Sequence, residues 1–88
     1  TEGTWNLYLI AVQPDQQGKG IGARLMQYIE DQLANRGQRV LLVETSGLAT
    51  YARTRQFYRR IGYDEEARIR EFYAAGDDKV IFRKALCA

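Results

Sequence analysis

The pattern of apolar and polar residues predicts strands that alternate with helices. Leu7 to Val12 and Val40 to Glu44 are almost unbroken apolar runs, typical of strands that are buried on both faces. Between these runs, apolar residues recur mostly three or four positions apart, as they do along one face of a helix. These residues are Ile21, Leu25, Met26, Ile29 and Leu33. Gly37 follows in the position that glycine favours after a helix, so we expect the helix to end there.

The second half of the chain predicts one more helix and a hairpin. A turn is expected at residues 45–47 (Thr-Ser-Gly), and helical spacing follows until Gly62. The apolar face of this helix comprises Tyr51, Thr54, Phe57, Tyr58 and Ile61. Two weaker extended segments, Ala67 to Arg70 and Val80 to Lys84, flank a Gly-Asp-Asp turn at residues 76–78. The expected order is therefore strand, loop, helix, strand, helix, strand, strand.

This order predicts an α/β fold with a ligand site at one edge of its sheet. Two buried strands joined by a helix imply a right-handed parallel crossover. Ligands of such sheets bind beyond the carboxyl ends of the strands. In this chain that edge holds Val12, the glycine-rich loop after it, and Glu44.

The glycine-rich loop, Gln-Gly-Lys-Gly-Ile-Gly at residues 17–22, has the chemistry of a phosphate cradle. Glycines let an anion approach the backbone, and the first amides of the following helix have no partner within it. A turn without a ligand is one alternative. A P-loop is excluded, because its spacing is missing. A dinucleotide fingerprint (Gly18, Gly20 and Ala23, with Glu44 as the ribose-binding acid) stays open, although five residues separate the strand from the loop.

Composition narrows the remaining classes of function. With 88 residues the chain is one domain, and a net charge of +2 does not indicate a nucleic-acid or membrane surface. There is no His and only one Cys, which argues against a catalytic triad, a metal site and an internal disulfide. The arginines between Arg53 and Arg60 are expected on a solvated helix face, or else against a phosphate. No signal peptide or membrane-spanning run is visible, so a cytoplasmic setting is the default.

Two motifs in this order resemble those of the GNAT superfamily of N-acetyltransferases. Ile-Ala-Val at residues 10–12, Pro14 and the glycine-rich loop resemble motif A, with Gln17, Gly20 and Gly22 in its defining positions. Phe-Tyr-Arg-Arg-Ile-Gly-Tyr at residues 57–63 resembles motif B. The resemblance covers nearly the whole chain. It implies a GNAT-like mixed sheet with flanking helices over residues 1–88, lacking the strands that open the family domain.

The resemblance also implies a co-substrate, acetyl-CoA, and no metal. The loop amides would bind the coenzyme A pyrophosphate, and the strand before the loop would bond the pantetheine arm through its main chain. The implied cofactor-binding residues are Ile10, Val12, Gln17, Gly18, Lys19, Gly20, Ile21 and Gly22. The acetyl carbonyl would meet a strand amide near Ile10, a small oxyanion site.

Tyr58 matches the family tyrosine that faces the coenzyme A sulfur, and its alternative role is packing on the apolar helix face. A hydrogen bond to the developing thiolate suffices, because tyrosine is a weaker acid than a thiol. An amine acceptor must lose a proton, and Glu44 is the best-placed carboxylate; the alternative is a strand that simply ends at a polar residue.

Motif B departs from the family pattern at Tyr51 and Thr54, where many members have Asn and Ala, so the pantetheine contact from this helix is in question. We expect an acetyl-CoA-dependent N-acetyltransferase that acts on a small-molecule or peptide amine by direct attack. A coenzyme A-binding module without turnover is the alternative. The exposed edge of the first strand would also suit a homodimer.

Overall fold

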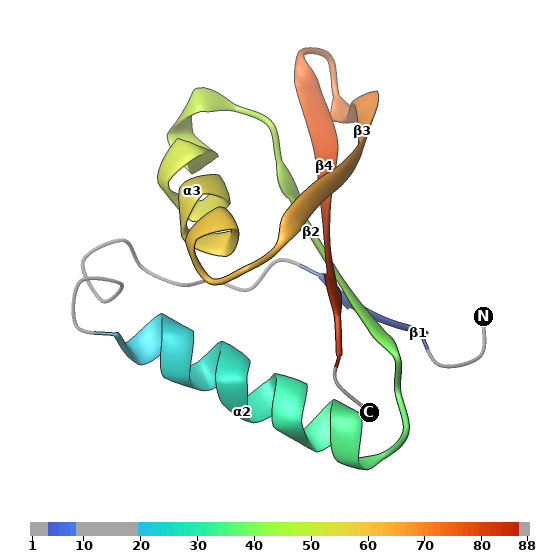
Figure 1. The fold of residues 1–88 in the computed structure, drawn as a ribbon. Helices are drawn as coiled ribbons and strands as arrows, with labels where there is room; N and C mark the ends of the chain where they lie inside the picture. The colour runs from blue at the N-terminus through green and yellow to red at the C-terminus, as the bar shows by residue number, and fades with distance from the viewer. Residues whose placement is uncertain (1–3, 9–19, 87–88) are drawn as a thin grey trace.

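The computed structural model describes residues 4–8 and 20–86, and its element order is the predicted one (Figure 1). The elements are β1 (Thr4–Tyr8), α2 (Ile21–Asn35), β2 (Val40–Ser46), a short 3-10 helix η1 (Ala49–Tyr51), α3 (Ala52–Arg60), β3 (Asp64–Ala74) and β4 (Asp77–Ala85). The first strand includes the start of the apolar run, Leu7 and Tyr8, while residues 9–12 of that run lie outside the described residues.

The strands form one mixed sheet in the order β1-β2-β4-β3. β1 pairs with β2 in parallel, as the crossover predicts, and β2, β4 and β3 pair antiparallel. The last pair between the described residues of β1 and β2 is Tyr8 with Glu44. β2 continues for two residues beyond this pair, where Thr45 and Ser46 pair with β4. The mixed α/β sheet expected from the sequence is thus confirmed.

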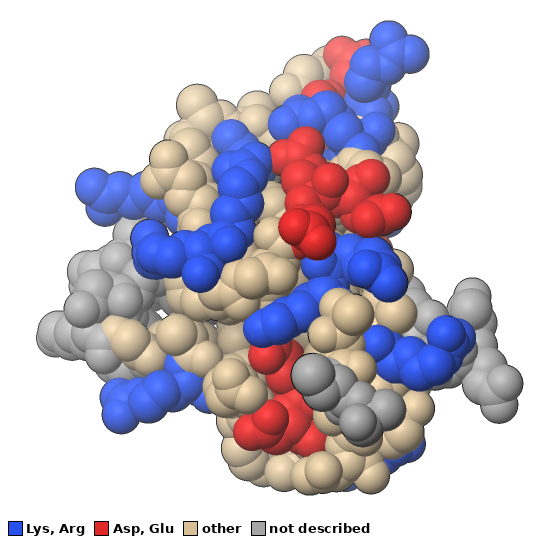
Figure 2. Space-filling view, in the orientation of Figure 1, with Lys and Arg blue, Asp and Glu red and all other residues tan. Residues whose placement is uncertain are grey.

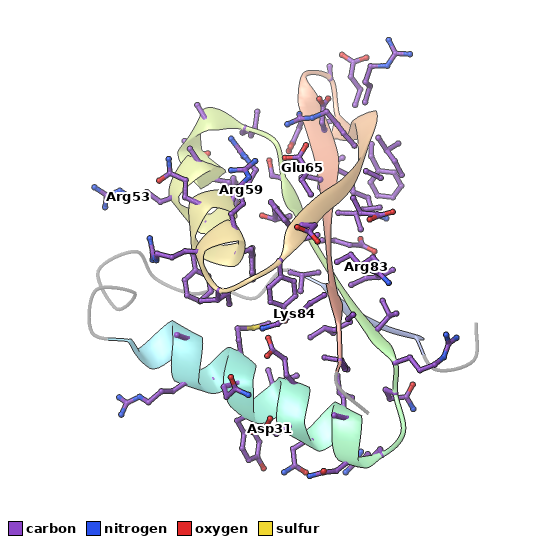
Figure 3. The ribbon with its side chains drawn as sticks, viewed as in Figure 1. Asp31, Arg53, Arg59, Glu65, Arg83 and Lys84 are labelled. Atoms are coloured by element: carbon purple, nitrogen blue, oxygen red, sulfur yellow. The ribbon has the colours of Figure 1, made fainter. Side chains whose placement is uncertain are left out.

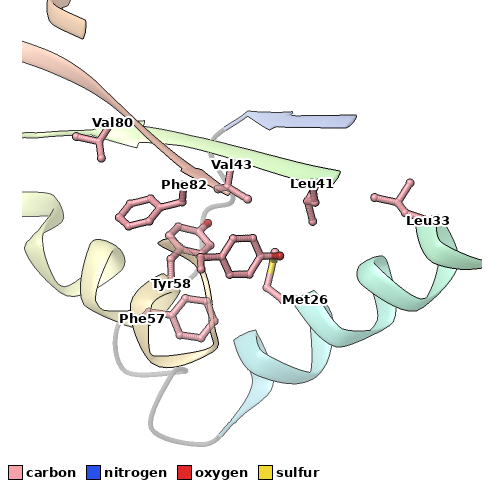
Figure 4. Close-up of a cluster of buried hydrophobic side chains, with 9 residues drawn as sticks. Met26, Leu33, Leu41, Val43, Phe57, Tyr58, Val80 and Phe82 are labelled. Carbon is pink, nitrogen blue, oxygen red and sulfur yellow. The ribbon is translucent and has the colours of Figure 1, made fainter. Parts of the chain in front are cut away.

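Helices α2 and α3 pack on the same face of the sheet and enclose the hydrophobic core (Figure 4). The core consists of Met26, Leu33, Leu41, Val43, Phe57, Tyr58, Tyr63, Val80 and Phe82. Because side chains alternate along a strand, Leu41, Val43 and Thr45 share this face, and Leu42, Glu44 and Ser46 point to the opposite face. The prediction that Leu25 belongs to the buried face of this helix was wrong. Leu25 is 45% exposed, because it lies at the edge of the apolar stripe, whose buried centre contains Met26 and Leu33.

Glycines end both helices, as predicted. Gly37 has a φ of 82° after α2, and its amide donates to the carbonyl of Ala34 at 3.0 Å. Gly62 has a φ of 99° after α3. These left-handed conformations are costly for residues with a Cβ, so each glycine turns the chain sharply into the next strand.

Three predicted boundaries were wrong, two of them because strand pairing overrides local turn propensity. Thr45 and Ser46 belong to β2, since they pair with Val80 and Lys79 of β4. The hairpin turn is confined to residues 75 and 76, and the two aspartates that follow belong to β4. Tyr51 lies in η1 rather than in α3, and it is 38% exposed.

A buried polar network ties α2 to the sheet. Glu30 of α2 is 6% exposed and accepts hydrogen bonds from the Tyr63 hydroxyl at 2.6 Å and from Lys84 Nζ at 3.0 Å. Lys84 also donates to the carbonyl of Ile61 at 3.0 Å. Figure 3 shows Lys84 between α2 and α3. Burial of the Glu30 carboxylate would be unfavourable without these partners. Because the partners come from β4 and from the chain just after α3, the network fixes α2 against both.

Candidate active site

The site is expected where α2 begins and β2 ends. Gly20 is the N-cap of α2 with a φ of 74°, and Gly22 is buried in the first turn. The first intrahelical bond is that from the Arg24 amide to the Gly20 carbonyl at 3.1 Å. The amides of residues 21–23 therefore have no partner within the helix, and Gly20 offers no side chain to cap them. These amides and the helix dipole form a site that suits an anion.

Most of the predicted cofactor-binding residues precede this helix end in the sequence. Ile10, Val12, Gln17, Gly18 and Lys19 lie outside the described residues. Ile21 is described only as the first residue of α2, without its side-chain environment. The assignment of these residues to coenzyme A remains a prediction.

Tyr58 is buried in an aromatic cluster, but its hydroxyl is not satisfied. Its ring lies 5.4–5.7 Å from those of Phe57, Phe82 and Tyr63. Within the described part of the chain, the hydroxyl has no hydrogen-bond partner, although the residue is 0% exposed. Burial raises the pKa of Tyr58 well above its ordinary value. A buried hydroxyl without a partner costs about 1–3 kcal/mol, so packing alone does not explain a tyrosine here.

Glu44 is not simply a polar residue at the end of a strand. It is 6% exposed, and its Oε1 lies 3.0 Å from Lys79 Nζ, which comes from the neighbouring strand β4. Lys79 in turn lies 4.3 Å from the centre of the Phe72 ring, which packs edge-to-face on Tyr73 at 5.2 Å. The Glu44 carboxylate is thus paired with the Lys79 ammonium group, beside the exposed rings of Phe72 and Tyr73.

The two predicted catalytic residues lie on opposite faces of the sheet. Tyr58 contacts the face that carries Val43 and Phe82, whereas Glu44 points to the other face. Glu44 pairs with Tyr8 of β1 and Ile81 of β4, and Tyr58 packs on Phe82, which pairs with Val43. A reaction that uses both residues would involve both faces of the sheet.

Sequence reasoning missed several residues around the site. Lys79 gave no signal, because its contact with Glu44 depends on the register between β2 and β4. Arg55, expected on a solvated helix face, donates to the carbonyls of Ser46 and Leu48 at 2.8 Å and so fixes α3 to the end of β2. The other arginines fit that expectation better: Arg53 points away from α3, and Arg59 forms an exposed ion pair with Glu65 at 2.7 Å (Figure 3).

Basic and acidic side chains are interspersed on the face of the molecule seen in Figure 2. Within residues 4–8 and 20–86, no cluster of His, Cys, Asp or Glu side chains could hold a metal ion. The helices described here are too short or too polar to cross a membrane.

Comparison with known proteins identifies the family. A model of the acetyltransferase (GNAT) domain matches residues 1–65. The chain is 33% identical over 73 residues to the ribosomal protein bS18-alanine N-acetyltransferase of Escherichia coli, and this match covers 83% of the chain and 48% of the relative. The chain belongs to the GNAT acetyltransferase family.

Solved structures agree with this assignment. A GNAT-family protein from Desulfovibrio desulfuricans has 46% sequence identity and a TM-score of 0.89, covering 99% of this chain and 55% of that one. The crystal structure of the E. coli enzyme has 27% identity and a TM-score of 0.79, covering 100% and 57%. An aminoglycoside 6'-N-acetyltransferase complexed with coenzyme A shares the fold, with 18% identity and a TM-score of 0.83. The chain thus spans about half the length of these relatives.

Proposed function

We propose that residues 1–88 are the cofactor-binding part of an acetyl-CoA-dependent N-acetyltransferase that transfers the acetyl group directly to a primary amine. Membership of the GNAT family supports this activity. The single observation that carries it is the Tyr58 hydroxyl, which is buried without a partner among the described residues. Because buried polar groups nearly always have a partner, such a hydroxyl is available to a group of the reacting substrate.

The start of α2 and the glycine-rich loop would hold the pyrophosphate of acetyl-CoA through backbone amides. The amides of residues 21–23, which have no partner within the helix, would supply hydrogen bonds, and the helix dipole favours the negative charge. Acetyl-CoA supplies the activated acetyl thioester. Ile10 and Val12 would bind the pantetheine arm through their main chains, as the family resemblance implies.

Tyr58 would act as a hydrogen-bond donor to the departing sulfur rather than as a full proton donor. Because burial raises the pKa of its hydroxyl, Tyr58 keeps its proton more firmly than a tyrosine in water does. A donor in water-excluded surroundings stabilises the negative charge that develops on the thiolate.

Glu44 would take the proton that the acceptor amine loses as it attacks. Its carboxylate points to the face opposite Tyr58, so the amine would approach from that face while acetyl-CoA is held from the other. Lys79 engages Oε1, which leaves Oε2 to accept the proton directly or through a water molecule. The exposed rings of Phe72 and Tyr73 lie beside this approach and would contact the acceptor.

The direct experiment measures release of free thiol from acetyl-CoA by the full-length protein in the presence of a panel of primary amines. We expect amine-dependent release, and a fall of about a hundredfold in Glu44→Gln, the size of a general-base contribution. Glu65→Gln is the matched control, because Glu65 forms an exposed ion pair with Arg59. Binding of acetyl-CoA without release for any amine would instead favour a coenzyme A-binding module.

A further inference from the structure

Three large apolar side chains that the described part of the chain leaves exposed come from one strand, β3. Ile69, Phe72 and Tyr73, here called the apolar cluster, are 43%, 54% and 37% exposed. They gather around Lys79 of β4. Ile69 pairs with Lys79 across the strands, the Phe72 ring lies 4.3 Å from its Nζ, and Tyr73 packs edge-to-face on Phe72. Exposed apolar side chains that adjoin one another, rather than lie singly, are typical of a binding surface.

The apolar cluster lies on the same face of the sheet as Glu44, the proposed base. Glu44 pairs with Ile81, and Ile81 pairs in turn with Ala67 of β3. Because paired residues point to the same face and side chains alternate along a strand, Ile69 shares this face. Burial raises the pKa of the Tyr73 hydroxyl, and the negative charge of Glu44 adds to the effect, as a nearby carboxylate does. An amine that reaches Glu44 would therefore lie beside the apolar cluster.

The carboxylate of Glu44 already has a counter-ion within the protein. Its Oε1 lies 3.0 Å from Lys79 Nζ, and the two side chains are only 8% and 13% exposed. The other carboxylate near Tyr73 is that of Asp77, which accepts a hydrogen bond from the Ser46 hydroxyl at 2.5 Å. The proposed base thus brings no uncompensated charge that would attract an acceptor with several positive charges. Additional ammonium groups would be repelled by Lys79 and would lose water against apolar side chains.

We propose that the acceptor is a primary amine that carries one positive charge in water and an apolar substituent, and that the apolar cluster binds this substituent while Glu44 receives a proton. The inference rests on the proposed function, because it requires acetyl transfer to an amine. After the ammonium ion has lost one proton to solvent, the neutral nitrogen bonds to the acetyl carbon and gives a second proton to Glu44. The carbon–sulfur bond breaks, and the sulfur leaves as a thiolate.

The test measures kcat/KM of the full-length protein for three amines at saturating acetyl-CoA, per neutral amine. 2-Phenylethylamine carries an aromatic substituent, ethanolamine a small polar one, and spermidine several charges. We expect kcat/KM for 2-phenylethylamine to exceed that for each of the others by about tenfold or more, the effect of burying one apolar group. A peptide with an N-terminal phenylalanine presents the same chemistry, so its comparison with 2-phenylethylamine distinguishes a polypeptide acceptor from a small molecule.

Variants of the apolar cluster identify the residues responsible. Phe72→Ala should lower the ratio of kcat/KM between 2-phenylethylamine and ethanolamine by about fivefold. Ile69→Ala, which leaves the contact between Phe72 and Lys79 in place, should lower it in the same direction. This ratio does not depend on the fraction of protein that is folded. Tyr28→Ala removes an aromatic side chain that is 63% exposed on α2, so it is the matched control and leaves the ratio unchanged.

Two kinds of failure are distinguishable. A kcat/KM for spermidine or ethanolamine that equals or exceeds that for 2-phenylethylamine, or a ratio that neither cluster variant changes, overturns this inference alone. Absence of thiol release with every amine contradicts the proposed function itself.

Discussion

Glu44 and Lys79 form an ion pair between neighbouring strands, with 3.0 Å between Oε1 and Nζ and with side chains only 8% and 13% exposed. Lys79 lies diagonal to Glu44, because the residues directly opposite are Ile81 for Glu44 and Ser46 for Lys79. The Phe72 ring covers the ammonium group from β3. The pair therefore joins the hairpin β3–β4 to the end of β2, where the acceptor amine is proposed to react.

We expect Lys79→Met to destabilise the protein by about 3 kcal/mol, since it leaves the buried carboxylate of Glu44 without a counter-ion. The double variant Glu44→Gln, Lys79→Met should regain a large part of this loss, because both charges are then absent. Urea unfolding of the two variants and of wild type measures the difference. A Lys79→Met variant within 0.5 kcal/mol of wild type, roughly the spread of ordinary surface substitutions, would contradict the buried pair.

Tyr58→Phe should lower turnover by about tenfold or more, because the thiolate loses its hydrogen-bond donor. Its affinity for acetyl-CoA should stay within about twofold, and the unliganded protein should not lose stability, since the deleted hydroxyl has no partner in the described structure. Steady-state kinetics and calorimetric titration separate these effects. Tyr63→Phe is the informative comparison, because it deletes a hydroxyl that does have a partner, Glu30, and should lower stability instead. Unchanged turnover in Tyr58→Phe would remove Tyr58 from the mechanism.

Alkaline pH should destabilise the protein through its buried tyrosines. Burial raises the pKa of Tyr58 and Tyr63 above the ordinary value of 10.0, and the hydrogen bond to Glu30 adds to the effect at Tyr63. The folded state thus binds these protons more tightly than the unfolded state, so the stability they contribute is complete below pH 10 and is lost as the pH rises above it. Urea unfolding between about pH 8 and pH 11, a range that brackets the ordinary tyrosine pKa, measures how steeply the free energy of unfolding falls with pH. Tyr63→Phe should make this slope shallower, and an identical slope would contradict the argument.

Gly20→Ala should cost about 1 kcal/mol of stability, because a residue with a Cβ disfavours the left-handed backbone found there at φ 74°. Gly37→Ala is a matched control, with φ 82° at the other end of α2 and, as at Gly20, open space around the added Cβ. Both variants should unfold at similar urea concentrations, but only Gly20→Ala should weaken acetyl-CoA binding. Equal affinity in the two variants would argue against a ligand at the start of α2.

The sequence allowed the element order and the helix ends to be predicted, because apolar runs and glycines act locally. Leu7, Met26 and Phe57 follow the expected pattern of strand or helix. The place of Thr45 in β2 was not predictable, since Thr-Ser-Gly is typical of a turn and only pairing with β4 extends β2 through it.

The Glu44–Lys79 pair could not be predicted from the sequence either. It depends on a strand register set by distant pairing, and β3 adds irregularities between Glu65 and Ala67 and between Ile69 and Ala74. Such register cannot be read from local residue patterns, whereas the glycine-rich loop and the Phe-Tyr motif are local and were recognised.

The central claim is that the backbone amides in the first turn of α2 bind the pyrophosphate of acetyl-CoA, and nuclear magnetic resonance tests it most directly. Amide spectra of the full-length protein should show the resonances of Gly20, Gly22 and Ala23 shifting as acetyl-CoA is added, with Gly37 at the far end of the helix unchanged. If acetyl-CoA binds while the resonances of residues 20–23 do not move, the anion site at this helix end is contradicted.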